Sequence, residues 1–267
     1  MVELGPPIAS GRTADIYAWQ DNQVLKLFHD WFPRESIMYE ATIARSIAAT
    51  GLPVPAVGEV LSVNGRNGLV YERLDGSTMF TALTRRPWNV IHYGRRLAEL
   101  QVDMHARSVP TGLPGQRQKI SHKINQAAGL SPQLKQRALT ALARLPDGGV
   151  LCHGDFHPGN ILITPQGERI IDWIDATSGN PLADVARTSI LALGAAASAQ
   201  MPGILPRIWT RLFHHAYIRR YFQLNPGGQA EYLRWRPVVA AARLSEGIIE
   251  LESWLMAEAA LCEYEKE

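Results

Sequence analysis

The sequence predicts an α+β fold with two parts, a small antiparallel β-sheet followed by a larger, mainly helical region. Up to about residue 74, short β-rich runs alternate with turns, and a single helical pattern lies between them. Beyond Gly76 the apolar spacing is mostly that of helices. The exception is a pair of short β-rich runs between residues 150 and 172, which encloses a polar loop. We therefore expect one domain over residues 1–74 and another over 75–267.

The composition is that of an ordinary globular protein, with 46% apolar and 19% charged residues among 267. The net charge is +2, from 27 basic and 25 acidic residues without a basic run, which argues against a nucleic-acid partner. The first ten residues lack signal-peptide features, and the apolar stretch 190–199 is too short to span a bilayer. Cys152 and Cys262 form no disulfide framework, so we expect a cytoplasmic protein. We expect no membrane partner and either a monomer or a homodimer.

Residues 8–17 and 24–28 are expected to form two strands around a turn. Lys26 interrupts the second apolar run and shares a face with Val24 and Phe28 at the strand period of two. It is either an edge-strand lysine in solvent or a cation with a specific partner.

Residues 33–50 have helical spacing, and Pro33 suits the first helical turn. Glu40 lies beside the apolar stripe of this helix, and a carboxylate directed inward needs a cationic partner. Lys26 is the nearest candidate in the sequence. The alternatives are that Glu40 is a boundary glutamate, or that Glu35, about 140° away on the helix, is the partner of Lys26.

Strands at 56–63 and 68–73 flank Asn64-Gly65, which is a strong hairpin signal. A hinge is expected at residues 72–76. The helices that follow have apolar residues at helical spacing, and Ser131-Pro132 gives one of them an N-cap and a proline in its first turn. They cover residues 88–107, 116–130, 131–145, 182–199, 204–223, 228–242 and 243–264.

The loop 153–160 is the most informative stretch, because it is flanked by the apolar runs 150–152 and 161–163. Glycine and proline within it prevent a continuous strand or helix. A third run, 169–171, follows a turn over 164–167 and ends at a carboxylate. We expect this hairpin to bring Asp155, Asn160 and Asp172 to one end of a small sheet. The loop side chains that can do chemistry are His153, Asp155, His157 and Asn160.

Phosphoryl transfer needs a carboxylate for the attacking hydroxyl, metal ligands that bridge phosphates and a cation on the nucleotide. One aspartate and one asparagine are enough for magnesium, which keeps several of its waters. The Asp-x-x-x-x-Asn spacing of a kinase catalytic loop is present at Asp155 and Asn160. The sequence supplies these parts in the order Lys26, Glu40, Asp155, Asn160, Asp172.

On three stretches the chain resembles the aminoglycoside phosphotransferase and choline kinase-like family, which is related to the protein kinases. The stretches are His153-Gly154-Asp155-Phe156-His157-Pro158-Gly159-Asn160-Ile161-Leu162, Ile171-Asp172-Trp173 and Asn180-Pro181-Leu182-Ala183-Asp184-Val185-Ala186. Weaker matches lie at 24–26, 40–55 and 97–105, so the resemblance runs from about residue 8 to 190. It implies a two-lobed protein-kinase-like fold with a nucleotide-binding lobe over 1–74 and a catalytic and acceptor-binding lobe over 75–267.

The resemblance also implies a role for each matching position. Asp155 would be the catalytic aspartate that orients, and could deprotonate, the acceptor hydroxyl. Asn160 and Asp172 would hold Mg²⁺. Lys26 would contact the α- and β-phosphates of ATP or GTP, and Glu40 would fix Lys26.

Other positions would have supporting roles. His153 and Asp184 would brace the catalytic loop, and His157 would either support it or touch the substrate. The nucleotide ring would bind the backbone of the hinge, at Glu72 to Leu74. The loop that covers the phosphates would include Ser10, Gly11 and Thr13, although it has a single glycine where a glycine-rich run is expected.

Two other classes of protein fit parts of the sequence. On a strand, His153, Asp155 and His157 would share one face and could bind a transition metal. A metal site of this kind leaves four residues without a role: Asn160, Asp172, Lys26 and Glu40. Pro158-Gly159 also disfavours a strand. A non-catalytic protein of the same fold would be expected to lack the lysine or one of the two aspartates, yet all are present. We therefore expect an enzyme, a small-molecule kinase.

The acceptor is the least defined part. An acidic wall near the C-terminus would suit a polycationic aminoglycoside, but the same glutamates could be the solvated face of a helix. They are Glu246, Glu250, Glu252, Glu258, Glu263, Glu265 and Glu267. Aromatic residues could instead line a pocket for a sugar, choline-like or macrolide-like acceptor: Trp209, Tyr217, Tyr221, Tyr232, Trp235 and Trp254. We expect an aminoglycoside-type antibiotic, and hence a role in resistance, with a small metabolite such as choline, homoserine or a sugar as the alternative.

Overall fold

The computed structural model of the chain describes residues 3–198 and 203–262 and confirms the α+β class. The chain forms two compact units. The first combines residues 1–79 with 159–175, and the second combines 80–158 with 176–267. Both units are discontinuous in sequence, whereas the expected lobes, divided between residues 74 and 75, are continuous. The assignment of nucleotide and acceptor binding to those lobes stays a prediction.

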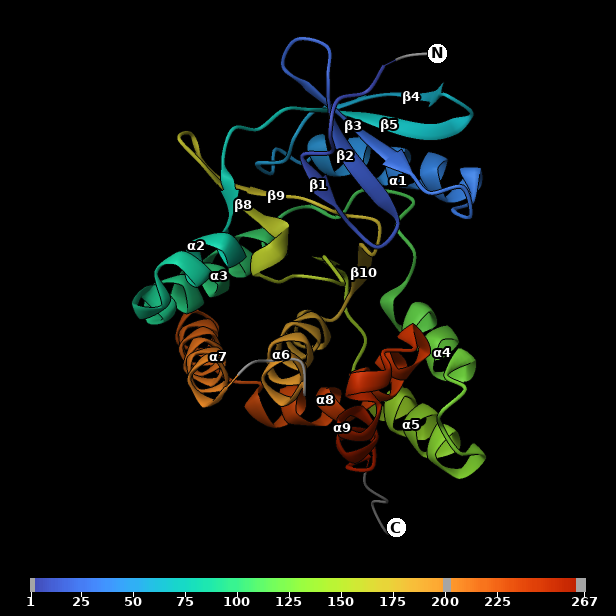
Figure 1. Cartoon of the computed structure of the whole chain (residues 1–267). Coiled ribbons are helices and arrows are strands. Elements are labelled where there is room, and N and C mark those ends of the chain that lie inside the picture. The colour runs from blue at the N-terminus through green and yellow to red at the C-terminus, as the bar shows by residue number, and fades with distance from the viewer. Residues whose placement is uncertain (1–2, 199–202, 263–267) are drawn as a thin grey trace. The chain divides into compact units, whose positions relative to one another are not determined.

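The first unit is built on a five-stranded antiparallel sheet (Figure 1) with the order β1-β2-β3-β5-β4. Its strands are β1 (Ala9–Ser10), β2 (Ala14–Trp19), β3 (Gln23–Phe28), β4 (Val57–Val63) and β5 (Arg66–Glu72). Asn64 and Gly65, between β4 and β5, both have positive φ, at 51° and 85°. Two such residues in a row make a two-residue hairpin turn whose twist matches the strands, as the sequence predicted.

Helix α1 (Arg34–Ala48) covers one face of this sheet (Figure 1). Ile37 and Ala41 on its inner face are fully buried against Phe28 of β3 and Leu69 of β5. The helix begins after Pro33, whose extended backbone and fixed φ suit the residue before a first turn. This packing fixes which side of α1 faces the strands, and Glu40 lies on that side with 2% of its surface exposed.

A second sheet in the first unit has the order β6-β8-β9. It contains β6 (Ser77–Thr78), β8 (Ile161–Thr164) and β9 (Gly167–Ile170), and the β8–β9 hairpin confirms the predicted pair of strands and its turn. The Thr164 hydroxyl closes that turn by donating to the Gly167 carbonyl at 2.7 Å. The hairpin is joined to the rest of the unit where the Ile170 amide donates to the Pro53 carbonyl at 3.0 Å.

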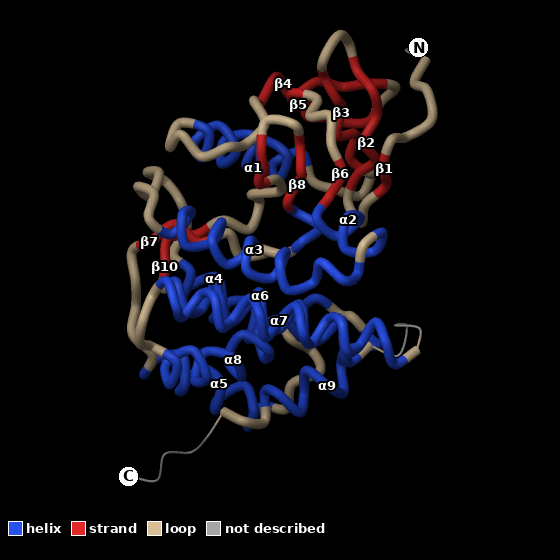
Figure 2. Tube along the Cα trace, turned by 90° about the vertical axis from the view of Figure 1, so that its left-hand side faces the viewer, coloured by secondary structure: helices blue, strands red, loops and turns tan. Residues whose placement is uncertain are grey.

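The second unit is mainly helical. Helices α3, α6 and α7 lie side by side in it (Figure 2). Among the described residues its helices are α2 (Met79–Arg85), which starts on the last residue of the first unit, α3 (Val90–His105), α4 (Gln116–Gln126), α5 (Pro132–Arg144), α6 (Pro181–Ala197), α7 (Ile204–Leu224), α8 (Gln229–Arg243) and α9 (Ile249–Ala259). One-turn 3₁₀ helices cover Pro87–Asn89, Pro158–Asn160 and Leu244–Glu246, and β7 (Val150–Cys152) pairs antiparallel with β10 (Thr177–Gly179).

The predicted helices are found, with two differences at their ends. The helix expected over 243–264 is interrupted at Gly247, whose φ of +63° ends the 3₁₀ turn before α9 begins. Helix α4 ends at Gln126 and not at residue 130. No helix among the described residues is both long enough and apolar enough to cross a membrane.

Candidate active site

The first unit contains a buried ion pair between Lys26 of β3 and Glu40 of α1. The Lys26 Nζ atom lies 2.7 Å from Glu40 Oε1, and the Tyr71 hydroxyl donates to the same oxygen at 2.9 Å. Lys26 Nζ also lies 3.4 Å from Asp172 Oδ1. The lysine is therefore held between two carboxylates, and the pairing with Glu40 rather than Glu35 follows from the side of α1 that packs on the sheet.

These charges keep Lys26 protonated. Burial favours the neutral amine, but the carboxylates of Asp172 and Glu40 outweigh burial and raise the pKa of Lys26 above its usual value. The pKa of Tyr71 is raised well above its usual value by burial and by the Glu40 charge, so its hydroxyl remains a donor. The arrangement presents a fixed ammonium group, which can bind an anionic ligand such as a phosphate.

Asn160 and Asp172 meet at one end of the β8–β9 hairpin. Asn160 immediately precedes β8, Asp172 follows β9 by two residues, and the Ile171 amide donates to the Asn160 carbonyl at 3.0 Å. Asp172 has a positive φ of 65°, a left-handed conformation that aspartate tolerates better than most residues. Its side chain is 42% exposed. A carboxylate and an amide oxygen are the hard ligands that Mg²⁺ prefers, so this pair fits a magnesium site that keeps several waters.

Asp155 belongs to the second unit and lies between two basic side chains. Its Oδ1 atom is 3.0 Å from Arg187 Nη2 of α6, and its Oδ2 atom is 3.4 Å from His157 Nε2. Burial favours the neutral acid, but the hydrogen bond with His157 and the charge of Arg187 outweigh it and hold the pKa of Asp155 far below its usual range. Asp155 is thus a carboxylate at any physiological pH and can accept a hydrogen bond from a substrate hydroxyl.

The expected meeting at one end of the hairpin is observed for Asn160 and Asp172, and the position of Asp155 beside them stays a prediction. Asn160 and Asp172 come together inside the first unit, whereas Asp155 lies in the second.

Arg187 was not among the residues predicted from the sequence. The available signal was that Asp184 and Arg187 are the only charged residues in the otherwise apolar or small-residue helix α6, one turn apart. Two isolated charges on such a helix have to find partners. The sequence could not show that the partner of Arg187 would be Asp155.

Asp184 braces the loop that carries Asp155. Its carboxylate is fully buried and accepts hydrogen bonds from the backbone amides of His153 at 3.2 Å and Gly154 at 2.7 Å. His105 Nε2 lies 3.1 Å from the same carboxylate, and the Gln101 amide donates to it at 2.9 Å. Burial opposes ionisation of Asp184, but these donors outweigh it and lower its pKa. The loop backbone is thus fixed by one charged side chain.

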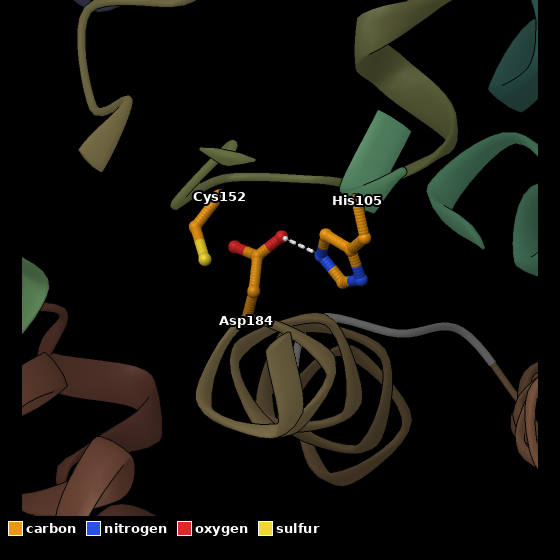
Figure 3. Close-up of side chains that lie close together, drawn as sticks. All are labelled: His105, Cys152 and Asp184. Carbon is orange, nitrogen blue, oxygen red and sulfur yellow. Dashed lines mark hydrogen bonds and ion pairs between the residues drawn. The ribbon is translucent and has the colours of Figure 1, made fainter. Parts of the chain in front are cut away.

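His105, Cys152 and Asp184 lie close together in this region (Figure 3), with potential ligand atoms within 4.8 Å of one another. The Asp184 oxygens already accept four hydrogen bonds, and burial raises the pKa of Cys152 well above its usual value, so the sulfur remains a thiol. A metal ion would need a thiolate and free oxygens. The cluster is therefore a hydrogen-bonded part of the core.

The alternative metal set predicted from the sequence, His153, Asp155 and His157, is not such a cluster in the described part of the chain. His153 is fully buried, and its Nδ1 atom accepts from the Asp155 amide at 3.2 Å. The loop has no extended strand there, because a 3₁₀ turn begins at Pro158.

The remaining predicted residues lie at the ends of strands in the first unit or in the segments that join those strands. Ser10 ends β1, and Gly11 and Thr13 form the turn before β2, in which the Gly11 amide donates to the Ala14 carbonyl at 2.9 Å. Glu72 ends β5, and its carboxylate accepts from the Ala56 amide at 3.0 Å. Leu74 follows in the segment between β5 and β6.

Comparison with known proteins identifies the family. Residues 5–237 match the profile of the phosphotransferase enzyme family known as APH. No curated protein matches the chain.

Solved structures with the same fold share 15–19% sequence identity with the chain. A thermostable mutant of the aminoglycoside phosphotransferase APH(4)-Ia has a TM-score of 0.67 in its apo form, at 16% identity over 98% of this chain and 94% of its own. In a ternary complex with AMP-PNP and hygromycin B that enzyme has a TM-score of 0.65, at 17% identity over 97% and 92%.

Two further solved structures are of kinases with other names. A choline/ethanolamine kinase family protein from Mesorhizobium loti has a TM-score of 0.60, at 16% identity over 98% and 87% of the two chains. The amicoumacin kinase hAmiN, solved with AMP-PNP, Ca²⁺ and Ami, has a TM-score of 0.64, at 15% identity over 95% and 86%. With the family profile covering most of its length, the chain belongs to the APH phosphotransferase family and is a phosphotransferase that acts on small molecules.

Proposed function

We propose that this protein transfers the γ-phosphoryl group of ATP or GTP to a hydroxyl group of a small molecule, with Mg²⁺ as cofactor. The observation that carries the proposal is the ammonium group of Lys26, held between Glu40 and Asp172. A fixed cation beside a metal-binding carboxylate is the arrangement that nucleotide phosphates require. The AMP-PNP found in two solved relatives supports a nucleotide donor.

In this proposal the first unit provides the nucleotide machinery. Lys26 binds the α- and β-phosphates, and Glu40 fixes its position. Asn160 and Asp172 would hold Mg²⁺. The bound metal ion would neutralise part of the negative charge of the phosphates. The backbone from Glu72 to Leu74 takes the nucleotide ring, and the turn that contains Ser10, Gly11 and Thr13 covers the phosphates.

Asp155 is the catalytic residue of the proposal. Because its pKa lies far below the usual range, it acts by accepting a hydrogen bond from the acceptor hydroxyl and orienting the oxygen for attack. A strong base is not needed early in a loose, dissociative transition state. His153, His157 and Asp184 support the loop, as their contacts with Asp155 and its neighbours indicate.

For the acceptor, the first candidate is an aminoglycoside-type antibiotic, which would make the enzyme a resistance factor. The support comes from the aminoglycoside phosphotransferase solved with hygromycin B.

The second candidate is a metabolite with few positive charges, such as a sugar or homoserine. The pairing of two of the C-terminal glutamates, Glu246 and Glu258, favours it. Glu246 lies 2.7 Å from Arg187 and Glu258 lies 2.8 Å from Arg236, so neither is an open acidic site for a polycation. Glu263, Glu265 and Glu267 of the acidic run lie outside the described residues.

The aromatic residues proposed as an alternative pocket lining divide into two groups. Tyr217, Tyr221, Tyr232 and Trp235 are buried, whereas Trp209 and Trp254 are half-buried. The Tyr232 hydroxyl donates to Ser189 Oγ at 2.9 Å, which is a core contact. Only the two half-buried tryptophans remain as direct candidates for acceptor contact.

The test is a screen for release of nucleoside diphosphate from Mg-ATP and Mg-GTP. Aminoglycosides, macrolides, choline, homoserine and simple sugars serve as acceptors, and Asp155→Asn is run in parallel as the blank. We expect one acceptor class to raise release at least tenfold over water with the unchanged protein but not with the variant. Equal release by the two proteins with every acceptor would overturn the proposal.

A further inference from the structure

Arg187 uses all three nitrogens of its guanidinium group to join the catalytic loop to the C-terminal region. Nη2 contacts Asp155 Oδ1 at 3.0 Å, Nε donates to the Gly154 carbonyl at 3.1 Å, and Nη1 contacts Glu246 Oε1 at 2.7 Å. The side chain is only 12% exposed. A planar guanidinium held at three points has little rotational freedom, so it defines where the Asp155 carboxylate lies.

Glu246 is itself held from a different direction. It belongs to the 3₁₀ turn after α8, and its Oε2 atom lies 3.3 Å from Arg243 Nε. Arg243 is buried and donates through Nη1 to the Ile190 carbonyl of α6 at 2.9 Å. Lys123 of α4 approaches Glu246 at 4.0 Å. Positively charged side chains from α4, α6 and α8 thus lie around Glu246, and the glutamate cannot move without disturbing these contacts.

We propose that Arg187 is the positioning residue for Asp155 and that Glu246 fixes Arg187 in that role. This inference rests on the proposed function of Asp155 as the group that orients the acceptor hydroxyl. It assigns to Glu246 an effect on the rate of phosphoryl transfer. The effect passes through Arg187, which contacts both Glu246 and Asp155.

The charges around Asp155 agree with this role. The groups that face it are His153 and His157 from its own loop and Arg187 from α6, and Arg243 of α8 interacts with it at longer range. Arg187 is the one permanently charged group in direct contact among them. Removing it should therefore raise the pKa of Asp155, as well as release the carboxylate from its position.

The test compares Arg187→Met, Arg187→Lys and Glu246→Gln in the full chain. An opposite charge within contact distance lowers the pKa of a carboxyl group by about 1–3 units. We expect Arg187→Met to raise the pKa of Asp155 by at least about one unit, measured by carboxyl ¹³C NMR with Asp155→Asn for assignment. We also expect kcat to fall about 10- to 100-fold, the KM for nucleotide to change less than twofold, and the acidic limb of the kcat profile to move to higher pH.

The other two variants separate charge from geometry. Arg187→Lys should keep the pKa of Asp155 close to its value in the unchanged protein, because lysine keeps the positive charge. It should recover less of kcat, because lysine lacks the planar guanidinium that contacts several partners at once. Glu246→Gln should lower kcat by a smaller factor, and the double variant with Arg187→Met should be no worse than Arg187→Met alone. The matched control is Arg236→Met, which removes a similarly buried arginine 2.8 Å from Glu258 and should leave both measurements unchanged.

An unchanged Asp155 pKa or an unchanged kcat in Arg187→Met would overturn the inference, and so would equal effects of Arg236→Met. The NMR titration does not depend on turnover. If the unchanged protein shows no transfer to any acceptor while the pKa still rises in Arg187→Met, the proposed function fails but the contact is verified. If transfer is present and the pKa does not move, only the positioning role fails.

Discussion

In Asp155 and Lys26, burial and nearby opposite charges compete in the same way. The result is a lowered pKa for Asp155 and a raised pKa for Lys26, so both groups stay charged. Each is penalised by burial, and each is kept ionised by partners of opposite sign. His157 and Arg187 stabilise the charged form of Asp155, whereas Asp172 and Glu40 stabilise the charged form of Lys26. In both cases the charged form is fixed in place before any ligand arrives, which is the condition for electrostatic preorganisation.

At the residue scale, Lys26→Met should destabilise the fold as well as abolish transfer. Glu40 is 2% exposed, and among the described residues its Oε2 atom has no hydrogen-bond partner, so losing Lys26 leaves a buried carboxylate with only the Tyr71 hydroxyl. Breaking a buried pair in this way costs about 3–5 kcal/mol of unfolding free energy. Urea denaturation measures the loss.

The control for that variant is the double substitution Lys26→Met with Glu40→Leu, which removes both charges. It should recover much of the lost unfolding free energy while transfer stays absent, because hydrophobic replacement of a whole buried pair is often neutral. If Lys26→Met denatures at the same urea concentration as the unchanged protein, the pair has no structural role.

At the scale of elements, the caps of α5 and α6 show how much a helix start depends on its surroundings. Ser131 accepts from the Leu134 amide at 3.2 Å at the start of α5. Asn180 accepts from the Leu182 amide at 2.8 Å, and its amide group also donates to the Pro146 carbonyl and to Glu231. Asn180 is buried, whereas Ser131 is exposed.

We therefore expect Ser131→Ala to lower the unfolding free energy by about 1 kcal/mol, the usual value for a lost N-cap. Asn180→Ala should lower it by about 2–4 kcal/mol, because the part-buried hydrogen bonds to the Pro146 carbonyl and to the Glu231 carboxylate are lost in addition to the cap. Chemical denaturation of the two variants side by side gives the comparison. Equal losses would mean that the additional contacts of Asn180 contribute nothing.

Helix α7 contains a histidine that should make the protein sensitive to acid. Burial, then the charges of Arg236 and His215, lower the pKa of His214 to about 4. The unfolded chain has a histidine pKa near 6.5 and so binds a proton first as the pH falls. Between those two values the unfolded state binds more protons, and stability must decrease with falling pH.

From pH 7 to pH 5 this histidine alone should remove up to about 2 kcal/mol of unfolding free energy. His214→Gln should make the pH dependence of the urea midpoint shallower by that amount. His92→Gln, a change at an exposed position of α3, is the matched control and should leave the slope as it is. A slope that is the same in all three proteins would contradict the assignment.

At the scale of the whole molecule, the sequence predicted the parts that depend on local rules. The Asn64-Gly65 turn, the cap at Ser131 and the β8–β9 hairpin are each specified within a few neighbouring residues. Helix α2 and strands β6 and β10 have too few residues to show a period and were not predicted. The two short strands form because β8 and β7 supply their hydrogen-bond partners, which no local pattern records.

The same distinction applies to the candidate site. Lys26, Glu40, Asp155, Asn160 and Asp172 could be proposed from the sequence because the residue types and their order along the chain match the parts that phosphoryl transfer needs. Arg187 and Glu246 could not, because their contacts link Asp155 to residues 32 and 91 positions later through packing of α6 and the turn after α8. Partners chosen by tertiary packing become visible only once the helices have been placed.

The division of the chain into two compact units leads to the last prediction, which separates nucleotide binding from transfer. Lys26, Asn160 and Asp172 belong to the first unit, and Asp155 belongs to the second. If the first unit holds Mg-ATP, Lys26→Met and Asp172→Asn should lose the rise in melting temperature that Mg-ATP gives. Asp155→Asn should keep that rise while transfer falls at least about 100-fold. Removal of Mg²⁺ with EDTA should abolish transfer by the unchanged protein, and its return should restore it. A melting temperature that rises with Mg-ATP in Asp172→Asn as in the unchanged protein would remove that carboxylate from the metal site, because a lost ligand has to weaken the complex that stabilises the fold.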